Sequence, residues 1–303
     1  MKKTGILTAA PFLLALAATA LAATGSAKAA ESAPHPKPGL KRVQLVTPAS
    51  AVTPGEPLAV GLILDPEPGF HTYWKGPGSV GVATTIEWNL PEGFEAGEIL
   101  WPPPEKTKMA GITAYGYRSE TCLLTDIATP EEIDADEVTI RAKVGWMACA
   151  TTCHPGLQNL TMTLPVNRSE TSPPRNGERA SRFKEIRASV PPPAPSDWTY
   201  ELRLAAPDRI ELDVFGTGVS PESIASLYFF SFDHQVDSDE PQTVSLVDAD
   251  SGAFRLELVR PNFAPSSPEA LEGVLHHPDG WPGIDASGVE ISVPWPDEAF
   301  PDE

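Results

Sequence analysis

The fold of the first half of this chain follows from one stretch, Val138-Thr139-Ile140-Arg141-Ala142-Lys143-Val144-Gly145-Trp146-Met147-Ala148-Cys149-Ala150-Thr151-Thr152-Cys153-His154-Pro155-Gly156. Apolar and polar residues alternate from Val138 to Trp146, and they alternate again from Leu160 to Val166. A period of two is typical of strands with one buried face. The segment between the two runs carries a C-x-x-x-C pair. We therefore predict a β-hairpin with Cys149 and Cys153 at its loop.

The two cysteines are so close in sequence that a disulfide between them would add little to the stability of the fold. In an extended chain, residues four apart are separated by about 13 Å, whereas a disulfide needs Cα atoms roughly 4.4–6.8 Å apart. The chain must therefore turn between Cys149 and Cys153. So small a ring stabilises a fold by only about 2 kcal/mol. We interpret the pair as redox chemistry, with a structural disulfide across a hairpin loop as the alternative.

The composition favours an all-β protein. The chain of 303 residues contains 34 prolines, about twice the usual share of ~5%, and proline is confined to turns and strand edges. The length suits two domains. Further strands are expected at 43–45, 58–64, 85–90 and 115–127 in the first half, and at 210–214, 227–232, 244–246, 254–258 and 289–293 in the second.

The N-terminus is typical of an exported protein. Lys2 and Lys3 precede an apolar run, and Ala27-Lys28-Ala29 forms an A-x-A cleavage site. We expect residues 1–29 to be a signal peptide and the mature chain to have no membrane span, because no other stretch is apolar for 18 or more residues. The formal net charge of −19 argues against nucleic acid as a partner. Disulfides persist in the periplasm, the compartment that we predict.

The remaining segments complete the expected domain organisation. Residues 30–40 are predicted to be a flexible lead-in, 41–167 a first β-sandwich, 168–197 a linker, 198–296 a second β-sandwich and 297–303 an acidic tail. Asn176 is a suitable N-cap for a short helix over 177–190, which Pro191 ends. The fold class is thus mainly β, with two immunoglobulin-like sandwiches joined by a short helical connector.

Several motifs resemble one known family. The run Gly69-Phe70-His71-Thr72-Tyr73-Trp74-Lys75-Gly76-Pro77-Gly78 resembles a segment of the N-terminal periplasmic region of the DsbD/ScsB thiol:disulfide interchange proteins. The run 100–105, the pair Gly116-Tyr117 and the strand that leads into Cys149-x-x-x-Cys153-His154-Pro155 are also similar to that family. The resemblance covers about residues 40–166, and the remainder is similar to the longer ScsB-type arrangement.

The resemblance implies an immunoglobulin-like domain that relays electrons through Cys149 and Cys153. It implies that Cys153 is the sulfur attacked, that Tyr73 lies near the pair, and that the segment around Met109 is a cap loop over the disulfide. We also place His71 and His154 among the supporting residues, because a protonated His154 favours a thiolate at its neighbour. The activity would be that of a protein-disulfide reductase component, without a cofactor or resident metal.

The implied partners are thioredoxin-like periplasmic proteins and a separate membrane-embedded reductant. Full-length members of the family continue into a membrane domain and a thioredoxin domain, which this sequence lacks. We therefore expect the electron donor to be another protein.

Two other functions stay open. One is Cu(I) binding, because His71, Met109, Met147 and the cysteine pair with His154 supply soft donors, and ScsB-type proteins are associated with copper tolerance. The other is a non-catalytic adaptor with a structural disulfide. The third cysteine, Cys122, lies in a strand-like run and is predicted to be a buried, inert thiol. A resolving or intermolecular thiol is the alternative for this residue.

Overall fold

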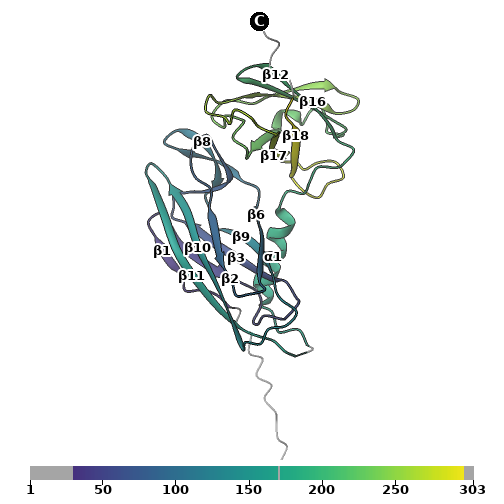
Figure 1. Ribbon diagram of the computed structural model, residues 1–303. Helices are drawn as coiled ribbons and strands as arrows, with labels where there is room; N and C mark the ends of the chain where they lie inside the picture. Colours follow the sequence, from purple (N-terminus) through teal and green to yellow (C-terminus); the bar gives the residue numbers. More distant parts are fainter. Residues whose placement is uncertain (1–29, 170, 297–303) are drawn as a thin grey trace, which may run out of the picture.

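The computed structural model describes residues 30–169 and 171–296 and shows a mainly β protein of two sandwiches (Figure 1). All strand pairs within the sheets are antiparallel. The predicted fold class is confirmed. The predicted signal peptide and acidic tail lie outside the described residues.

The first sandwich contains three sheets around one core, to which alternating residues of several strands contribute. The sheets are, in spatial order, β1 (His35–Lys37), β2 (Leu40–Val46), β3 (Leu58–Pro66), β9 (Thr121–Ala128) and β6 (Glu95–Leu100); β11 (Cys153–Pro165), β10 (Glu137–Cys149) and β5 (Thr85–Asn89); and β4 (Thr72–Gly78), β8 (Ile112–Tyr117) and β7 (Glu105–Met109).

The predicted hairpin is present as β10 and β11. Its register runs without a break from the pair Glu137 and Pro165 to the pair Cys149 and Cys153. The alternating apolar residues Val138 to Trp146 of β10 and Leu160, Met162 and Leu164 of β11 face the core, because side chains alternate between the two faces of a strand, whereas Leu157 is exposed. The regular ladder therefore carries the cysteines to the tip of the hairpin.

The lead-in expected to be flexible is instead part of the first sheet. The Ser32 hydroxyl accepts a hydrogen bond from the Leu45 amide at 2.9 Å, and the Ser32 amide donates to the Leu45 carbonyl at 2.9 Å. Strand β1 follows and pairs with β2 at the edge of the sheet. Prolines are tolerated there because an edge strand leaves one side of its backbone unpaired.

The run 115–127, predicted as one strand, belongs to two. Strand β8 ends at Tyr117 and pairs with β4 and β7, whereas β9 begins at Thr121 and pairs with β3 and β6. The polar residues between them turn the chain, and the Arg118 amide donates to the Glu105 carboxylate at 2.7 Å. The polar residues 118–120 interrupt the apolar run, and they are the local signal of this change of sheet.

The predicted helix is α1 (Gly177–Ser189), and the Asn176 side chain caps it by accepting from the Arg179 amide. Phe183 is buried against the outer face of the first sheet, where it contacts the side of β9 that carries Cys122. Arg187 forms two hydrogen bonds with Asp126, at 2.7 and 2.8 Å. The connector is therefore packed on the first sandwich.

The second sandwich has a core of its own, which includes Leu212, Phe254 and Trp281. It comprises a four-stranded and a three-stranded sheet, and it includes two strands that the sequence did not indicate, β12 and β17. The elements are β12 (Thr199–Ala206), β13 (Arg209–Phe215), β16 (Ala253–Val259) and β15 (Thr243–Asp248); β14 (Tyr228–Ser231), β17 (Ala270–His276) and β18 (Gly288–Pro294); and the 3-10 helix η1 (Ile224–Ser226).

Aromatic side chains join the two sandwiches. Trp74 of β4 lies edge-on to Phe230 and Phe232, with ring centroids 6.3 and 6.0 Å apart. The hydroxyls of Tyr115 and Tyr228 lie 2.9 Å apart. Because Trp74 is almost fully buried in these contacts, the strand that carries it is held between the two domains.

No helix in residues 30–169 and 171–296 is both long enough and apolar enough to cross a bilayer.

Candidate redox site at the hairpin tip

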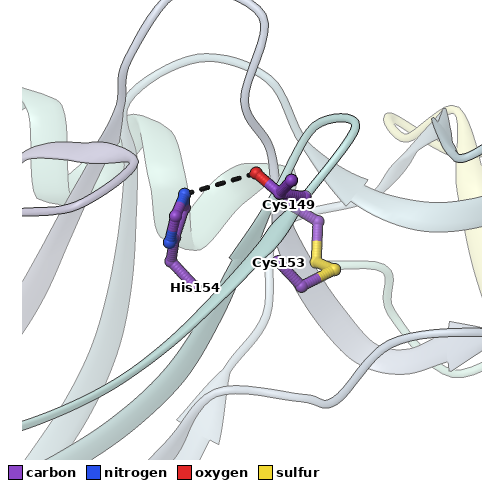
Figure 2. Close-up of a disulfide and its surroundings, with 4 residues drawn as sticks. Cys149, Cys153 and His154 are labelled. Carbon is purple, nitrogen blue, oxygen red and sulfur yellow. Dashed lines mark hydrogen bonds between the residues drawn. A yellow bond between two sulfur atoms is a disulfide. The ribbon is translucent and has the colours of Figure 1, made fainter.

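The cysteines form a disulfide at the tip of the β10–β11 hairpin (Figure 2). Cys149 and Cys153 are direct partners in the register, and their Cα atoms are 4.1 Å apart. Between them, the Ala150 amide donates to the Thr152 carbonyl at 3.0 Å and closes the turn. The hairpin turn therefore brings the two cysteines together, as their spacing in the sequence required.

The two sulfur-bearing residues have very different surroundings. Cys149 is fully buried, whereas Cys153 is exposed. Thiol–disulfide exchange needs an approaching thiolate to reach a sulfur atom, and the thiol that leaves must tolerate a negative charge. The geometry leaves Cys153 open to an approaching molecule and shelters Cys149.

His71 touches the buried half of the disulfide through its backbone. Its amide donates to the Cys149 carbonyl at 2.9 Å, and the Cys149 amide donates to the His71 carbonyl at 3.0 Å. Burial lowers the pKa of the His71 imidazole, the charge of Arg118 lowers it further, and Glu105 opposes the shift. Burial thus disfavours the charged form of the His71 imidazole, whose Nε2 atom has no hydrogen-bond partner among the described residues.

Tyr73 packs in one cluster with Cys149 and Ala114. Its ring lies edge-on to the His71 ring, with centroids 4.9 Å apart, and burial raises the pKa of its hydroxyl to about 12. Gly81 allows the chain to cross this ring closely, because a Cβ atom there would lie 2.0 Å from a Tyr73 ring carbon. The predicted position of Tyr73 beside the pair is what the structure shows.

Met109 lies at the end of the hairpin formed by β7 and β8, which we call the cap hairpin (Glu105–Tyr117). Ala110 and Gly111 form its turn with φ values of +50° and +95°, as expected for a two-residue turn of type I′. The partly buried side chains of Met109 and Met147 pack against the cluster of Cys149 and Tyr73. The cap hairpin thus reaches the disulfide from a different sheet.

His154 lies apart from the other predicted site residues. Its ring is 5.6 Å from the Phe70 ring, and its Nε2 atom is 3.4 Å from the Thr152 hydroxyl. Figure 2 shows the His154 side chain and the disulfide on opposite sides of the strand, as expected for adjacent residues. The structure therefore brings together His71, Tyr73, Met109 and the cysteines, and it leaves His154 outside that group.

Two residues of the cluster around Cys149 were not evident from the sequence. Val80 packs against the Cys149 cluster from the segment after β4, and Ala114 enters it from β8. Both are ordinary apolar residues without a local motif. Only the pairing of β4 with β8 places them here, so a sequence pattern offered no signal for them.

The third cysteine lies elsewhere. Cys122 is buried, as predicted, on the face of the first sheet that α1 covers. Burial raises the pKa of its thiol to about 12. A thiol that stays protonated is a poor nucleophile, which makes Cys122 unsuited to exchange with the disulfide.

Metal donors are sparse. Within the described residues, no group of three His, Cys, Asp or Glu side chains could hold an ion. The thioethers of Met109 and Met147 pack against the cluster that contains Cys149. This donor set suits a soft metal such as Cu(I) better than a hard one.

Comparisons with known proteins agree with this geometry. The family model for "Thiol:disulfide interchange protein DsbD, N-terminal" matches residues 42–165. No curated protein matches the sequence. Among solved structures, the N-terminal periplasmic domain of ScsB from Proteus mirabilis has a TM-score of 0.57 at 17% identity, covering 88% of this chain and 99% of that one. That similarity shows a common fold that includes the second sandwich. Residues 42–165, which contain both cysteines, are a domain of the DsbD N-terminal family of thiol:disulfide interchange proteins.

Proposed function

We propose that the protein relays electrons in the periplasm through the Cys149–Cys153 dithiol and disulfide. A reductant converts the disulfide to two thiols, and an oxidised protein converts them back. Membership of a thiol:disulfide interchange family supports this role for residues 42–165. The single observation that carries it is the asymmetry of the pair, with one cysteine exposed and the other buried.

The exchange has two balanced steps. A thiolate of the donor attacks Sγ of Cys153, the bond between the cysteines breaks, and Cys149 leaves as a thiolate that takes up a proton. A second donor thiolate then attacks the donor's own sulfur in the mixed disulfide and releases Cys153. The donor becomes a disulfide, and the protein gains two electrons and two protons. The same steps in reverse reduce the oxidised acceptor.

The proposed partners are proteins with exchange chemistry of their own. We infer thioredoxin-like periplasmic proteins on one side and a membrane-embedded reductant on the other, as the family resemblance implies. The predicted signal peptide supports export, and the structurally similar ScsB domain is periplasmic. Supporting roles are proposed for His71, Tyr73 and Met109, which surround Cys149, and for His154, which is next to Cys153 in sequence.

Two variants, each with one cysteine of the pair replaced, test which sulfur is attacked. Cys149→Ser leaves an exposed thiol at Cys153, and Cys153→Ser leaves a buried thiol at Cys149. With the disulfide reagent 5,5′-dithiobis(2-nitrobenzoate), we expect the first variant to form a mixed disulfide at least about tenfold faster than the second. Both variants retain Cys122, so any labelling of that thiol contributes equally to the two measurements. Equal rates, or faster labelling of Cys149, would contradict the proposed direction of attack.

Cu(I) binding is the second candidate, because Met109 and Met147 pack beside Cys149. The test is a titration of the reduced protein with Cu(I) in the presence of a bathocuproine chelator. If the protein is an electron relay without a copper site, the chelator should retain the Cu(I). Withdrawal of one equivalent of Cu(I), lost in a Met109→Leu/Met147→Leu variant, would establish a copper site instead.

A further inference from the structure

The elements that enclose Cys149 are tied to the second sandwich by a small set of hydrogen bonds. Two segments cover the buried cysteine from outside its own sheet. One is the cap hairpin, with Met109 and Ala114, and the other is the segment 79–81 that follows β4, with Val80. Both meet the loop between β14 and β15 at residues 237–239, which we call the clasp.

Ser238 is the centre of the clasp and is almost fully buried. Its hydroxyl donates to the Thr113 carbonyl at 2.6 Å and accepts from the Ser79 amide at 2.8 Å. The Ser238 amide donates to the Ser79 hydroxyl at 3.0 Å. A Cβ atom at Gly78 would lie 2.5 Å from the Ser238 hydroxyl oxygen, so the close approach depends on glycine. One side chain thus links both covering segments.

The neighbouring carboxylates extend the clasp. Asp239 Oδ1 accepts from the Thr113 amide and from the Thr113 hydroxyl, each at 2.8 Å, and Lys108 Nζ lies 3.9 Å away. Asp237 accepts from the Ser79 hydroxyl at 2.6 Å. Thr113 and Lys108 belong to the cap hairpin on either side of its turn, which places these contacts a few residues from Met109.

Away from its turn, the cap hairpin is held by aromatic contacts: the Tyr115 ring lies edge-on to Phe230, and Lys106 Nζ lies 3.2 Å from the centroid of the Tyr228 ring. The pairing of the cap hairpin with β4 is irregular, since the register shifts between Tyr73 and Gly78. A cavity of about 440 Å³ opens beside the clasp, lined among others by Lys106, Tyr228 and Asp239. Packing between the cap hairpin and the second sandwich is incomplete there, so the hydrogen bonds of the clasp are the attachment nearest the turn.

We propose that Ser238 and Asp239 are positioning residues for thiol–disulfide exchange, which hold the cap hairpin and segment 79–81 closed over Cys149. Closure keeps the leaving thiol of Cys149 in a dry, apolar cluster, which disfavours its thiolate and slows attack on Cys153. The second sandwich therefore sets the reactivity of a disulfide that it does not contain. This inference rests on the proposed redox function.

The test is the rate constant for reduction of the full two-domain protein by dithiothreitol. Reaction through an open form scales with the population of that form. We expect Ser238→Ala and Asp239→Ala each to raise the rate about tenfold, which corresponds to about 1.4 kcal/mol. Asp239→Asn retains the oxygen that accepts from Thr113 and should stay near the wild-type rate.

The matched control is Glu290→Gln. It removes the charge of Glu290 from a 3.0 Å contact with Lys75, which also joins the two sandwiches but does not touch the cap hairpin. Its rate should equal that of the wild type. Rates of Ser238→Ala and Asp239→Ala within twofold of this control, with melting temperatures retained, would overturn the proposal.

The experiment distinguishes failure of the clasp proposal from failure of the proposed relay function. A disulfide that is readily reduced in all variants at one rate refutes the clasp and leaves the relay intact. A wild-type disulfide that resists reduction refutes the relay. In that case, variants that become reducible support the clasp, and variants that remain resistant refute it.

Discussion

Reduction of Cys149–Cys153 should leave the first sandwich folded. The bond joins residues separated by four positions, so it closes a ring of five residues. The chain-entropy relation gives a contribution of about 2 kcal/mol for such a ring. The hairpin that presents the pair has a continuous register along both strands, and a reduced Cys149 remains a small apolar side chain in its cluster. A relay must keep its fold in both redox states, and this loss is small enough to allow it.

The assay compares urea unfolding of the oxidised protein with that of the protein kept in dithiothreitol. Free thiols are counted in denaturant, where the oxidised protein should give one thiol, from Cys122, and the reduced protein three. We expect one folded baseline in both states and a difference in unfolding free energy of about 2 kcal/mol. A reduced protein that is unfolded in the absence of urea, or a loss of more than about 4 kcal/mol, would refute the reasoning and mark the bond as structural.

Three further predictions concern the residues around the disulfide and the helix. Burial depresses the pKa of the His71 imidazole in the folded protein. As the pH falls, the imidazole is therefore protonated in the unfolded chain before it is protonated in the folded protein. The stability that His71 contributes is present above about pH 6.5 and is lost as the pH falls through the folded-state pKa. Unfolding free energies at about pH 7 and pH 5 should therefore fall less in His71→Asn than in the wild type, and equal slopes would contradict this. Cys122, with a pKa raised to about 12, should resist iodoacetamide in the folded protein near pH 8, and peptide mass spectra that show its alkylation would count against its burial. Phe183→Ala should lower the unfolding free energy by about 3–5 kcal/mol, and a loss below about 1 kcal/mol in urea unfolding would mean that α1 is not packed on the first sheet.

The sequence identified the elements whose signal is local. Alternation predicted the β10–β11 hairpin, and the cysteine spacing required a turn at its tip. Asn176 and Pro191 predicted the limits of α1, because an N-cap and a helix-breaking proline are both local features. Motifs shared with one family then placed Tyr73 and Met109 near the pair.

What the sequence left out depends on long-range packing. The polar residues 118–120 indicate a turn between Tyr117 and Thr121, but that β8 and β9 belong to different sheets depends on their distant partner strands. Residues 30–40 are rich in proline, which looks like a flexible segment, yet their polar groups add an edge strand to β2. The exposure of Cys153, the burial of Cys149 and the clasp at Ser238 arise from contacts between distant segments, for which a single sequence contains no periodic signal.

The reduction potential of the Cys149–Cys153 pair tests the central claim most directly. The mature protein is equilibrated in glutathione or dithiothreitol buffers of defined ratio, and its free thiols are counted by mass. We predict a potential within the range of known thiol–disulfide carriers, about −120 to −270 mV. A potential below about −300 mV, typical of structural disulfides, would contradict the relay and favour an adaptor whose disulfide only holds the hairpin tip together.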